Sequence, residues 1–253
     1  MLESTIKAVL NSFEPIGLKD INDVKLMDRV DTKFSFNVDH LATFLKSLEA
    51  DYNVLVIENN PISKYHSLYY DNEVLSAFND HRRSRPNRFK VRFRKYVYSN
   101  IQFLEVKHKV HGRTVKTRIP SDSIPLEMNN QQETFVHKTG IKGDLTPTLQ
   151  NEFNRVTLIR KDHSERVTFD FDISFEWEGK KIELDQIVIA ELKQSKADRN
   201  SSFYKLMKKT MIRPMKLSKY CIGMIATREK QNIKYNRFKK KLLFIKKIQK
   251  NVA

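Results

Sequence analysis

Basic and apolar side chains alternate along several segments of this chain, and that alternation constrains the fold more than any other feature. In RFKVRFRKY (88–96), the even positions are Arg or Lys as far as Arg94, and the odd positions are apolar as far as Phe93. Successive side chains of a β-strand point to opposite faces of a sheet. The segment therefore predicts a strand with one cationic face and one face that packs into a core.

The same two-residue period continues through most of the chain and predicts an antiparallel, β-rich fold with helical insertions. The expected strands are 26–36, 53–58, 64–70, 88–98, 101–110, 113–119, 152–160, 165–176 and 186–193, with a hairpin turn at Gly112. Helical spacing of apolar residues predicts two short amphipathic helices, one over residues 6–13 and one over 41–48 after the candidate cap Asn37. Residues 120–150 collect Pro and Gly and are expected to form a loop with one short helix.

The charge balance predicts a polyanionic partner. The 253 residues include 47 Lys and Arg against 30 Asp and Glu, which gives a net charge of +17 and a pI near 9.8. Nucleic acid, a phosphorylated small molecule, an inorganic polyanion and an acidic membrane surface all satisfy this expectation. Residues 228–253 carry ten of the basic residues and a single acidic one, Glu229. We therefore expect one domain over residues 1–227, including the N-terminal helix, and a basic C-terminal helix or tail over 228–253.

Two arrangements explain the cationic strand faces. A half-exposed sheet with a solvated polar face explains each strand taken singly. Solvated faces normally mix Thr, Ser and Gln with Lys, however, whereas four or five successive strands here repeat Arg and Lys. A closed antiparallel barrel explains the repetition, with apolar side chains facing outward onto helices and charged ones lining the interior. Such a lumen suits a polyphosphate-like ligand, because crowded like charges repel unless an anion and a few carboxylates compensate them.

Other patterns are less informative. The seven histidines show no HxxxH or HExxH spacing, and the six glycines form no P-loop, GxGxxG or GxSxG motif. The single cysteine, Cys221, excludes an internal disulfide and is expected to be a small buried hydrophobe. No apolar run reaches the roughly 18 residues of a spanning helix, and the N-terminus lacks a signal-peptide pattern, so we expect a cytoplasmic location.

Nine motifs, taken in order, resemble the VTC domain, the polyphosphate polymerase domain of the vacuolar transporter chaperone complex and its free-standing bacterial relatives. They are DRVDTKF (28–34), YHSLYYD (65–71), RFKVRFRKY (88–96), FLEVKHK (103–109), VKTRI (115–119), FNRVTL (153–158), RVTFDFDI (166–173), VIAELK (188–193) and KLSKYCIG (216–223). The resemblance implies an α+β fold built on a closed antiparallel β-barrel with a basic lumen, covered by helices. This is the triphosphate tunnel fold of the CYTH enzymes.

The resemblance also implies the residues of the site. The family's phosphate-contacting basic residues fall on Lys33, Arg92, Arg94, Lys107, Lys116, Arg155, Arg166, Lys216 and Lys219. The first seven are expected to contact the reacting phosphates, and the last two to bind substrate together with Ser218, which matches a hydroxyl contact. Lys109 and Lys193 share the charged strand faces and are also expected to bind substrate. Glu191 matches the carboxylate that binds Mn²⁺ or Mg²⁺, with Glu105 as a second candidate; Glu191 could instead pair with Lys193.

Three departures from the family pattern bear on function. Phe153 stands where a tyrosine is common, so one phosphate hydrogen bond is expected to be missing. Lys109 stands where a histidine can occur. The ExExK signature of CYTH triphosphatases and cyclases is absent near the N-terminus, where DRVDTK is found instead, and this absence argues against a hydrolase.

The sequence therefore predicts an enzyme, an ATP-dependent polyphosphate polymerase. It would transfer the γ-phosphoryl group of the nucleotide to a growing inorganic polyphosphate chain, with Mn²⁺ or Mg²⁺. ATP and polyphosphate are the expected partners, nucleic acid is not, and the basic tail could add a peripheral membrane contact. One alternative is a hydrolase of the same fold that cleaves triphosphate or polyphosphate. Another is a non-catalytic module that binds RNA or polyphosphate. If the arginine faces are buried inside a barrel, such a module could not recognise a nucleic-acid duplex.

Overall fold

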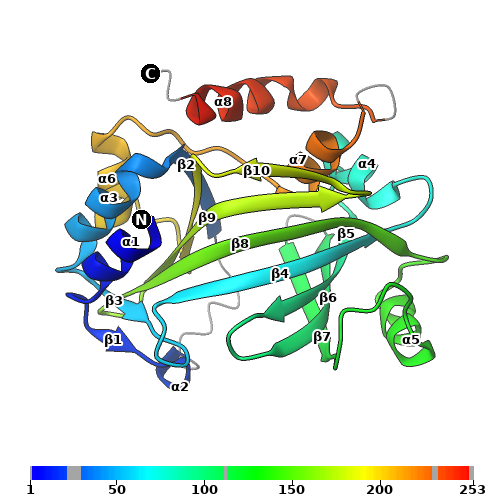
Figure 1. Cartoon of the computed structure of the whole chain (residues 1–253), viewed down its shortest axis with the longest axis horizontal. Helices are drawn as coiled ribbons and strands as arrows, with labels where there is room; N and C mark the ends of the chain where they lie inside the picture. Colours follow the sequence, from blue (N-terminus) through cyan, green and yellow to red (C-terminus); the bar gives the residue numbers. More distant parts are fainter. Residues whose placement is uncertain (1, 22–29, 111–112, 230–232, 251–253) are drawn as a thin grey trace.

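The computed structural model describes residues 2–21, 30–110, 113–229 and 233–250 (Figure 1). The strands are β1 (Pro15–Ile16), β2 (Val30–Asn37), β3 (Tyr52–Leu55), β4 (Ile62–Asp71), β5 (Arg88–Tyr96), β6 (Ile101–Val110), β7 (Arg113–Pro120), β8 (Thr146–Arg160), β9 (Glu165–Trp177), β10 (Lys180–Leu184) and β11 (Ile187–Gln194). The helices are α1 (Leu2–Leu10), α2 (Leu18–Ile21), η1 (Val38–His40), α3 (Leu41–Leu48), α4 (Ser76–Arg83), α5 (Asn130–Lys138), α6 (Ser202–Lys209), α7 (Lys219–Thr227), η2 (Asn236–Phe238) and α8 (Lys239–Gln249). Within these residues, no helix is both long and apolar enough to cross a membrane.

The strands form one large sheet, so the fold is α+β. Its main path runs β2-β11-β9-β8-β4-β5-β6-β7, and all neighbours on this path pair antiparallel. Off the path, β10 pairs with β9, β3 with β8, and β1 runs parallel to β3. Long-range antiparallel pairing thus brings residues from both ends of the sequence into one layer.

Each expected strand is present; β6 has the predicted bounds, and the other strands have shifted ends. β8 begins at Thr146 rather than at residue 152, because its first residues pair with the end of β4. The predicted strand residues 26–29 and the predicted turn at Gly112 lie outside the described residues. Asn37 caps a helical turn as expected: its Oδ1 accepts the Asp39 N–H at 2.8 Å, at the start of η1, which leads into α3. β1, β10, α4, α6 and α7 were not predicted, since each is short or lacks a clear period.

The expected closed barrel needs a correction, because the sheet is open among the described residues. Pairing ends at β2 on one side and at β7 on the other. β7 is largely exposed and carries Arg113, Lys116 and Arg118. Charged side chains on an edge strand oppose pairing with a further strand, and the curved sheet forms an open trough.

The convex face of this trough carries the apolar side chains that the alternation predicts. Beneath α1, α3 and α6, Phe34, Val167 and Phe169 belong to one buried core. Beneath α5, Val91 and Phe93 belong to another. Helices thus cover the apolar side of the sheet (Figure 1), and the charged residues of the same strands face the concave side.

The concave face has an apolar end, which α7 and α8 fill. Leu149, Phe175 and Ile189 of the sheet pack against α7, where Cys221 is 1% exposed, as the sequence predicts. α8 covers this end through buried Ile245, and the Ile248 carbonyl accepts the amide of Asn37, Nδ2 to O, at 3.1 Å.

A close approach at Gly223 fixes the position of α7 against the sheet. A Cβ atom at this position would lie 2.4 Å from Cδ1 of Phe175 and 2.5 Å from Cδ2 of Leu149. Real carbon atoms do not approach so closely, so any larger residue would force the Phe175 and Leu149 side chains or the helix itself to shift. Because α7 begins with Lys219, its displacement would also move that side chain.

We therefore expect Gly223→Ala to destabilise the protein even though alanine favours helices. Overpacking of a tight core costs about 1–3 kcal/mol, which exceeds the gain of about 1 kcal/mol from helix propensity. Urea unfolding measures the difference. Ala226→Ser, at a half-buried position on the same helix, is the control and is expected to change stability by less. Equal stability of wild type and Gly223→Ala would contradict the close packing.

Candidate active site

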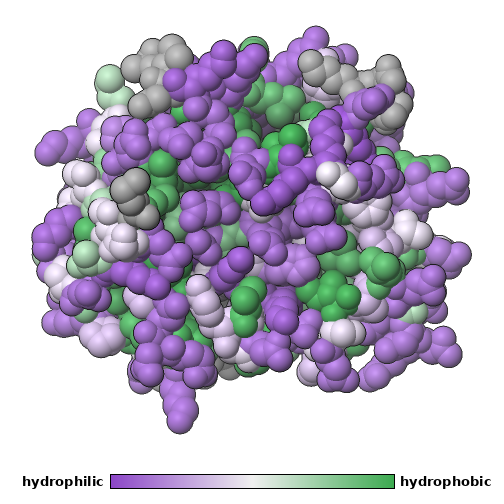
Figure 2. Space-filling model, in the orientation of Figure 1, coloured by the Kyte–Doolittle hydropathy of each residue, from purple (hydrophilic) through white to green (hydrophobic). Residues whose placement is uncertain are grey.

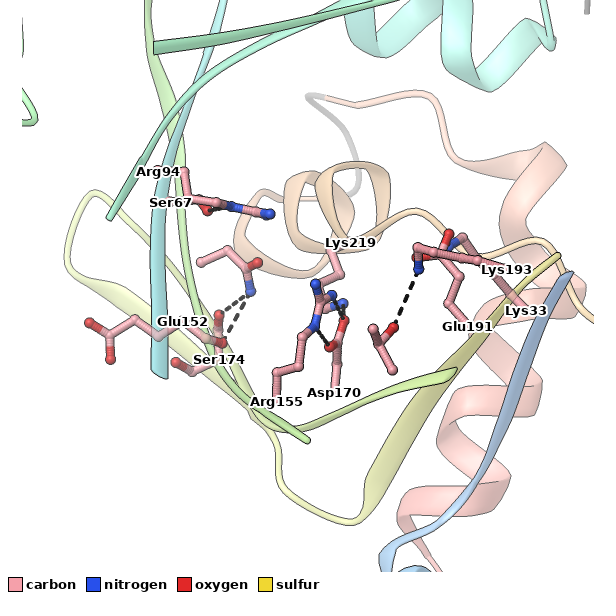
Figure 3. A network of polar contacts seen from close by, with 12 residues as sticks. Lys33, Ser67, Arg94, Glu152, Arg155, Asp170, Ser174, Glu191, Lys193 and Lys219 are labelled. Carbon is pink, nitrogen blue, oxygen red and sulfur yellow. Dashed lines mark hydrogen bonds and ion pairs between the residues drawn. The ribbon is translucent and has the colours of Figure 1, made fainter. Parts of the chain in front are cut away.

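The strand register brings basic residues from most of the sheet onto the concave face. Cross-strand partners share a face. The charged partners include Lys33 with Glu191, Lys193 with Arg166, Arg155 with Asp170, Arg92 with Glu105, and Lys107 with Lys116. Figure 3 shows several of these side chains converging on one space between the strands, with α7 behind them. The repeated two-residue period therefore has the consequence that the sequence predicts, a shared cationic interior.

At the β2–β11 end of this face, two lysines hold Glu191. Lys193 Nζ donates to Glu191 Oε2 at 2.5 Å, and Lys33 pairs with Oε1. Burial opposes ionisation of Glu191, but the two lysines outweigh it and keep the pKa of the carboxyl well below its usual value. Burial lowers the pKa of Lys193 to about 8, although Glu191 partly opposes this shift. The sequence left open a Glu191–Lys193 ion pair, and the structure contains it.

In the middle of the face, Asp170 bridges Arg155 and Lys219. Arg155 donates from Nε to Oδ1 at 2.5 Å and from Nη2 to Oδ2 at 2.8 Å, and Lys219 also pairs with Oδ2. Burial opposes the charge on Asp170, but Arg155 and Lys219 together lower the pKa of this carboxyl. Lys219 comes from the start of α7, so the helix completes a cluster that the sheet begins.

Glu105 forms the third bridge, between β5 and β7. Arg92 donates to Glu105 Oε2 from Nε at 2.9 Å and from Nη2 at 2.8 Å, and Lys116 Nζ lies 2.5 Å from Oε1. Glu105 has no solvent exposure. Burial opposes ionisation of this carboxyl, but Arg92, Arg94 and Lys116 lower its pKa. Burial lowers the pKa of Lys116 to about 8 despite its contact with Glu105.

Toward the middle of this face, Lys90, Arg94 and Lys107 have no carboxylate partner among the residues that the structure describes. Arg94 is 7% exposed, and its Nε donates to Ser67 Oγ at 3.3 Å. Lys90 Nζ donates to Ser218 Oγ at 3.0 Å. Burial lowers the pKa of all three groups, and neighbouring Arg92 adds to the shift. Buried charge without compensation is costly, so this region favours an anion.

The start of α7 adds a further positive element. Ser218 caps the helix: its Oγ accepts the Cys221 N–H at 3.3 Å while it also accepts from Lys90. The N-terminus of a helix carries a partial positive charge and free N–H groups. The capped helix end and Lys219 therefore meet the cations of the sheet in one place.

Phe153, which stands where the family commonly has a tyrosine, contacts basic side chains of the site through its ring. Its ring stacks on Tyr65 with centroids 5.1 Å apart. Lys219 Nζ lies 4.4 Å from the Phe153 centroid, and the guanidinium carbons of Arg155 and Arg94 lie 5.2 and 5.8 Å from it. Cations are attracted to aromatic faces. The ring therefore supports three of the basic side chains where a hydroxyl is absent.

Most residues expected from the sequence lie in this shared space, and two lie at its rim. Arg166 stands opposite Lys193 on the same face. Lys109 faces the concave side at the far end of β6, and exposed Lys216 precedes α7. Burial lowers the pKa of Lys109, and Arg88 and Lys216 add to the shift, so these cations stand near one another. Lys109 and Lys216 therefore belong to the mouth of the site rather than its interior.

Sequence reasoning did not assign Lys90, Asp170, Ser67 or Tyr69 to the site. Lys90 and Asp170 stand in the alternating pattern and could have been found by parity. Tyr69 occupies the same face of β4 as Ser67, and Arg92 Nη1 donates to its hydroxyl at 3.3 Å. Burial raises the pKa of this hydroxyl, but Arg92, Arg94 and Lys90 outweigh it and lower the pKa overall.

The described side chains that could bind a metal ion do not form a complete site by themselves. The described part of the chain contains no group of three His, Cys, Asp or Glu side chains that could hold a metal ion. Glu105, the second candidate ligand, is committed to Arg92 and Lys116. Mg²⁺ commonly binds through one or two carboxylates, with waters and substrate phosphates completing its shell. Glu191 is likewise held, by Lys33 and Lys193, so it could act as a single ligand for a metal that arrives with a nucleotide only if these lysines turn to the substrate phosphates.

Comparisons with known proteins come from three sources. The family model described as the VTC domain matches residues 28–228, while a search of curated proteins found no match. Among solved structures, a candidate adenylyl cyclase from Hippeastrum with a dominant triphosphatase activity is 13% identical, with 80% of this chain and 98% of that chain covered and a TM-score of 0.49. A candidate adenylate cyclase from Vibrio parahaemolyticus is 12% identical, with 74% of this chain and 94% of that chain covered and a TM-score of 0.45. A candidate adenylate cyclase from Bacillus halodurans is 9% identical, with 76% of this chain and 96% of that chain covered and a TM-score of 0.45. Because the family model spans most of the sequence, the chain belongs to the VTC domain family.

Proposed function

We propose that this protein is an ATP-dependent polyphosphate polymerase that works on the concave face of its sheet. The observation that carries the proposal is a group of cations without carboxylate partners in the described chain: buried Arg94, with Lys90 and Lys107, which are partly buried. Membership in the VTC domain family supports the same reaction. A linear polyphosphate carries charge along its length, and cations from several strands can compensate it.

The proposed reaction moves one phosphoryl group. The bond between the γ-phosphorus and the β–γ bridging oxygen of ATP breaks, a terminal oxygen of the acceptor polyphosphate bonds to that phosphorus, and ADP leaves. The acceptor oxygen is already deprotonated near neutral pH, so no protein base is required. Phosphoryl transfer passes through a loose transition state, and catalysis depends on positioning and on stabilising the charge of the phosphoryl oxygens.

The residues of the chain would bind and orient the phosphates. Arg92 and Arg94 are two residues apart on one strand face, so they can hold adjacent phosphate oxygens, and guanidinium groups do so bidentately. Lys107 and Lys219 supply further charge from β6 and α7. Glu191 is the proposed ligand for Mn²⁺ or Mg²⁺, which would neutralise charge on the nucleotide phosphates when bound.

A hydrolase of the same fold is a weaker interpretation on electrostatic grounds. Hydrolysis needs a group that activates water, and a carboxylate with a raised pKa is one choice, while a bound metal ion is another. Glu105, Asp170 and Glu191 each have a lowered pKa because two cations hold each carboxyl. These carboxylates are therefore suited to compensating charge rather than to accepting a proton.

We expect Arg94→Ala to reduce turnover by a factor of about 10² to 10³, the usual cost of removing one preorganised donor from a charged transition state. Purified protein is incubated with saturating ATP and Mn²⁺ or Mg²⁺, and ³¹P NMR follows ADP, phosphate and internal polyphosphate signals. The double variant Lys246→Ala/Lys247→Ala is the control, because it removes two exposed charges from α8.

Polyphosphate from wild type and from the α8 control, with little from folded Arg94→Ala, supports a polymerase. Release of phosphate without polymer would favour the hydrolase. Equal, modest losses in Arg94→Ala and the α8 control would reject a specific role for Arg94 and favour a binding module.

The affinity for tripolyphosphate is expected to fall as pH rises from 7 to 9. Lys116 and Lys193, with pKa values of about 8 in the free protein, are protonated below that pH and lose charge above it. A bound anion favours the charged lysines, so binding takes up protons near pH 8 and weakens when pH rises. Calorimetry in two buffers of different ionisation enthalpy measures this uptake. The control is the double variant Lys116→Arg/Lys193→Arg, in which both side chains stay charged up to pH 9. If the affinity of this variant for tripolyphosphate still falls steeply with pH, the two lysines are not the cause.

A further inference from the structure

Outside the concave face, the turn after α4 gathers arginines around a second hollow. The hollow has a volume of about 420 Å³ and is lined by Arg82, Arg83, Ser84, Arg85, Pro86 and Arg237. Five of these residues are consecutive, and Arg237 comes from η2 in the C-terminal segment, which packs beside α4. Figure 2 shows that hydrophilic residues cover much of the molecular face in view, so charge alone does not distinguish this place. Its distinguishing feature is that four arginines line one hollow.

Backbone hydrogen bonds hold the turn in shape. Ser84 adopts the left-handed conformation, with φ of 57°, and ends α4. The Arg85 N–H donates to the Asp80 carbonyl at 2.9 Å, and Arg237 Nη1 donates to the Arg83 carbonyl at 3.3 Å. The side chain of Arg88 donates to the Arg85 carbonyl. Backbone acceptors around the hollow are thus already occupied, while guanidinium donors remain.

The charge of these arginines is not compensated. Across the described ranges, none of Arg82, Arg83, Arg85 and Arg237 has an ion-pair partner. Arg82 Nη2 has only a long contact of 3.4 Å with Asn79 Oδ1, and its Nε is buried without a hydrogen-bond partner. Burial lowers the pKa of Arg82, and the charges of Arg83 and Arg237 lower it further. A buried donor without a partner costs free energy, and an anion would supply the acceptor.

We propose that this hollow is a second anion site, separate from the concave face, which binds a free oligophosphate in solution. Guanidinium groups pair bidentately with phosphate oxygens. Four of them in one hollow exceed what a single phosphate can neutralise, so a chain of two or more phosphates is the better match. The site stands independently of the reaction proposed for the concave face, because none of its arginines belongs to that face.

Titration calorimetry of the full chain with tripolyphosphate, without metal, tests this site. Wild type is expected to bind two tripolyphosphates. Arg83→Ala/Arg85→Ala is expected to bind one, and Arg237→Ala to weaken one of the two sites by about tenfold. Lys208→Ala/Lys209→Ala, which removes two exposed charges from α6, is the matched control and is expected to keep both sites. Circular dichroism checks that each variant is folded, and Arg237→Ala decides the result if the double variant is not.

Equal stoichiometry and affinity in the hollow variants and the α6 control would overturn the second site. Vesicles of phosphatidylglycerol distinguish a lipid headgroup from a free oligophosphate: hollow-dependent vesicle binding without hollow-dependent tripolyphosphate binding would overturn the ligand proposed here. Arg94→Ala separates the two sites, since it should remove only the site on the concave face. If Arg94→Ala changes nothing while the hollow variants lose a site, the concave-face proposal fails and the second site stands.

Discussion

Mutual repulsion among buried cations is the constraint on which the structure of the concave face depends. Three carboxylates on this face reduce the repulsion, because each of them bridges two cations. Glu191 lies between Lys33 and Lys193, Asp170 between Arg155 and Lys219, and Glu105 between Arg92 and Lys116. Each bridge joins different elements, so the contacts that compensate charge also link β2 to β11, β5 and β7 to β6, and β8 and β9 to the start of α7. The cations left over are Lys90, Arg94 and Lys107, and the proposed anion would complete the balance there.

One helix turns this charged surface into a site. α7 packs so closely at Gly223 that its start is fixed against β8 and β9. Its cap, Ser218, accepts from Lys90, and Lys219 joins the Arg155–Asp170 pair. The apolar half of α7 belongs to the core, and its polar start belongs to the site. The stability of the fold and the geometry of the candidate site therefore both depend on the close contact at Gly223.

The alternation in the sequence was enough to predict which strand residues share a face, because side-chain parity is a local property. It predicted Arg92, Arg94 and Arg155 together for that reason. It could not predict that Asp170 would bridge to Lys219, because that contact depends on where α7 packs, 49 residues further along the chain. The open edge between β2 and β7 and the rim position of Lys216 also depend on long-range packing. A local pattern therefore gave the chemistry of the face, and tertiary contacts decided its shape.

The most direct test of a phosphate-binding concave face is a crystal structure of the protein with tripolyphosphate. Phosphate oxygens are expected within hydrogen-bond distance of Arg94, Lys90 and Lys107, with at least one of the carboxylate bridges opened as its cations turn to the ligand. The opposite result would contradict a phosphate-binding concave face. In that case tripolyphosphate would bind only elsewhere on the surface, and the three carboxylate bridges would stay intact around an empty concave face.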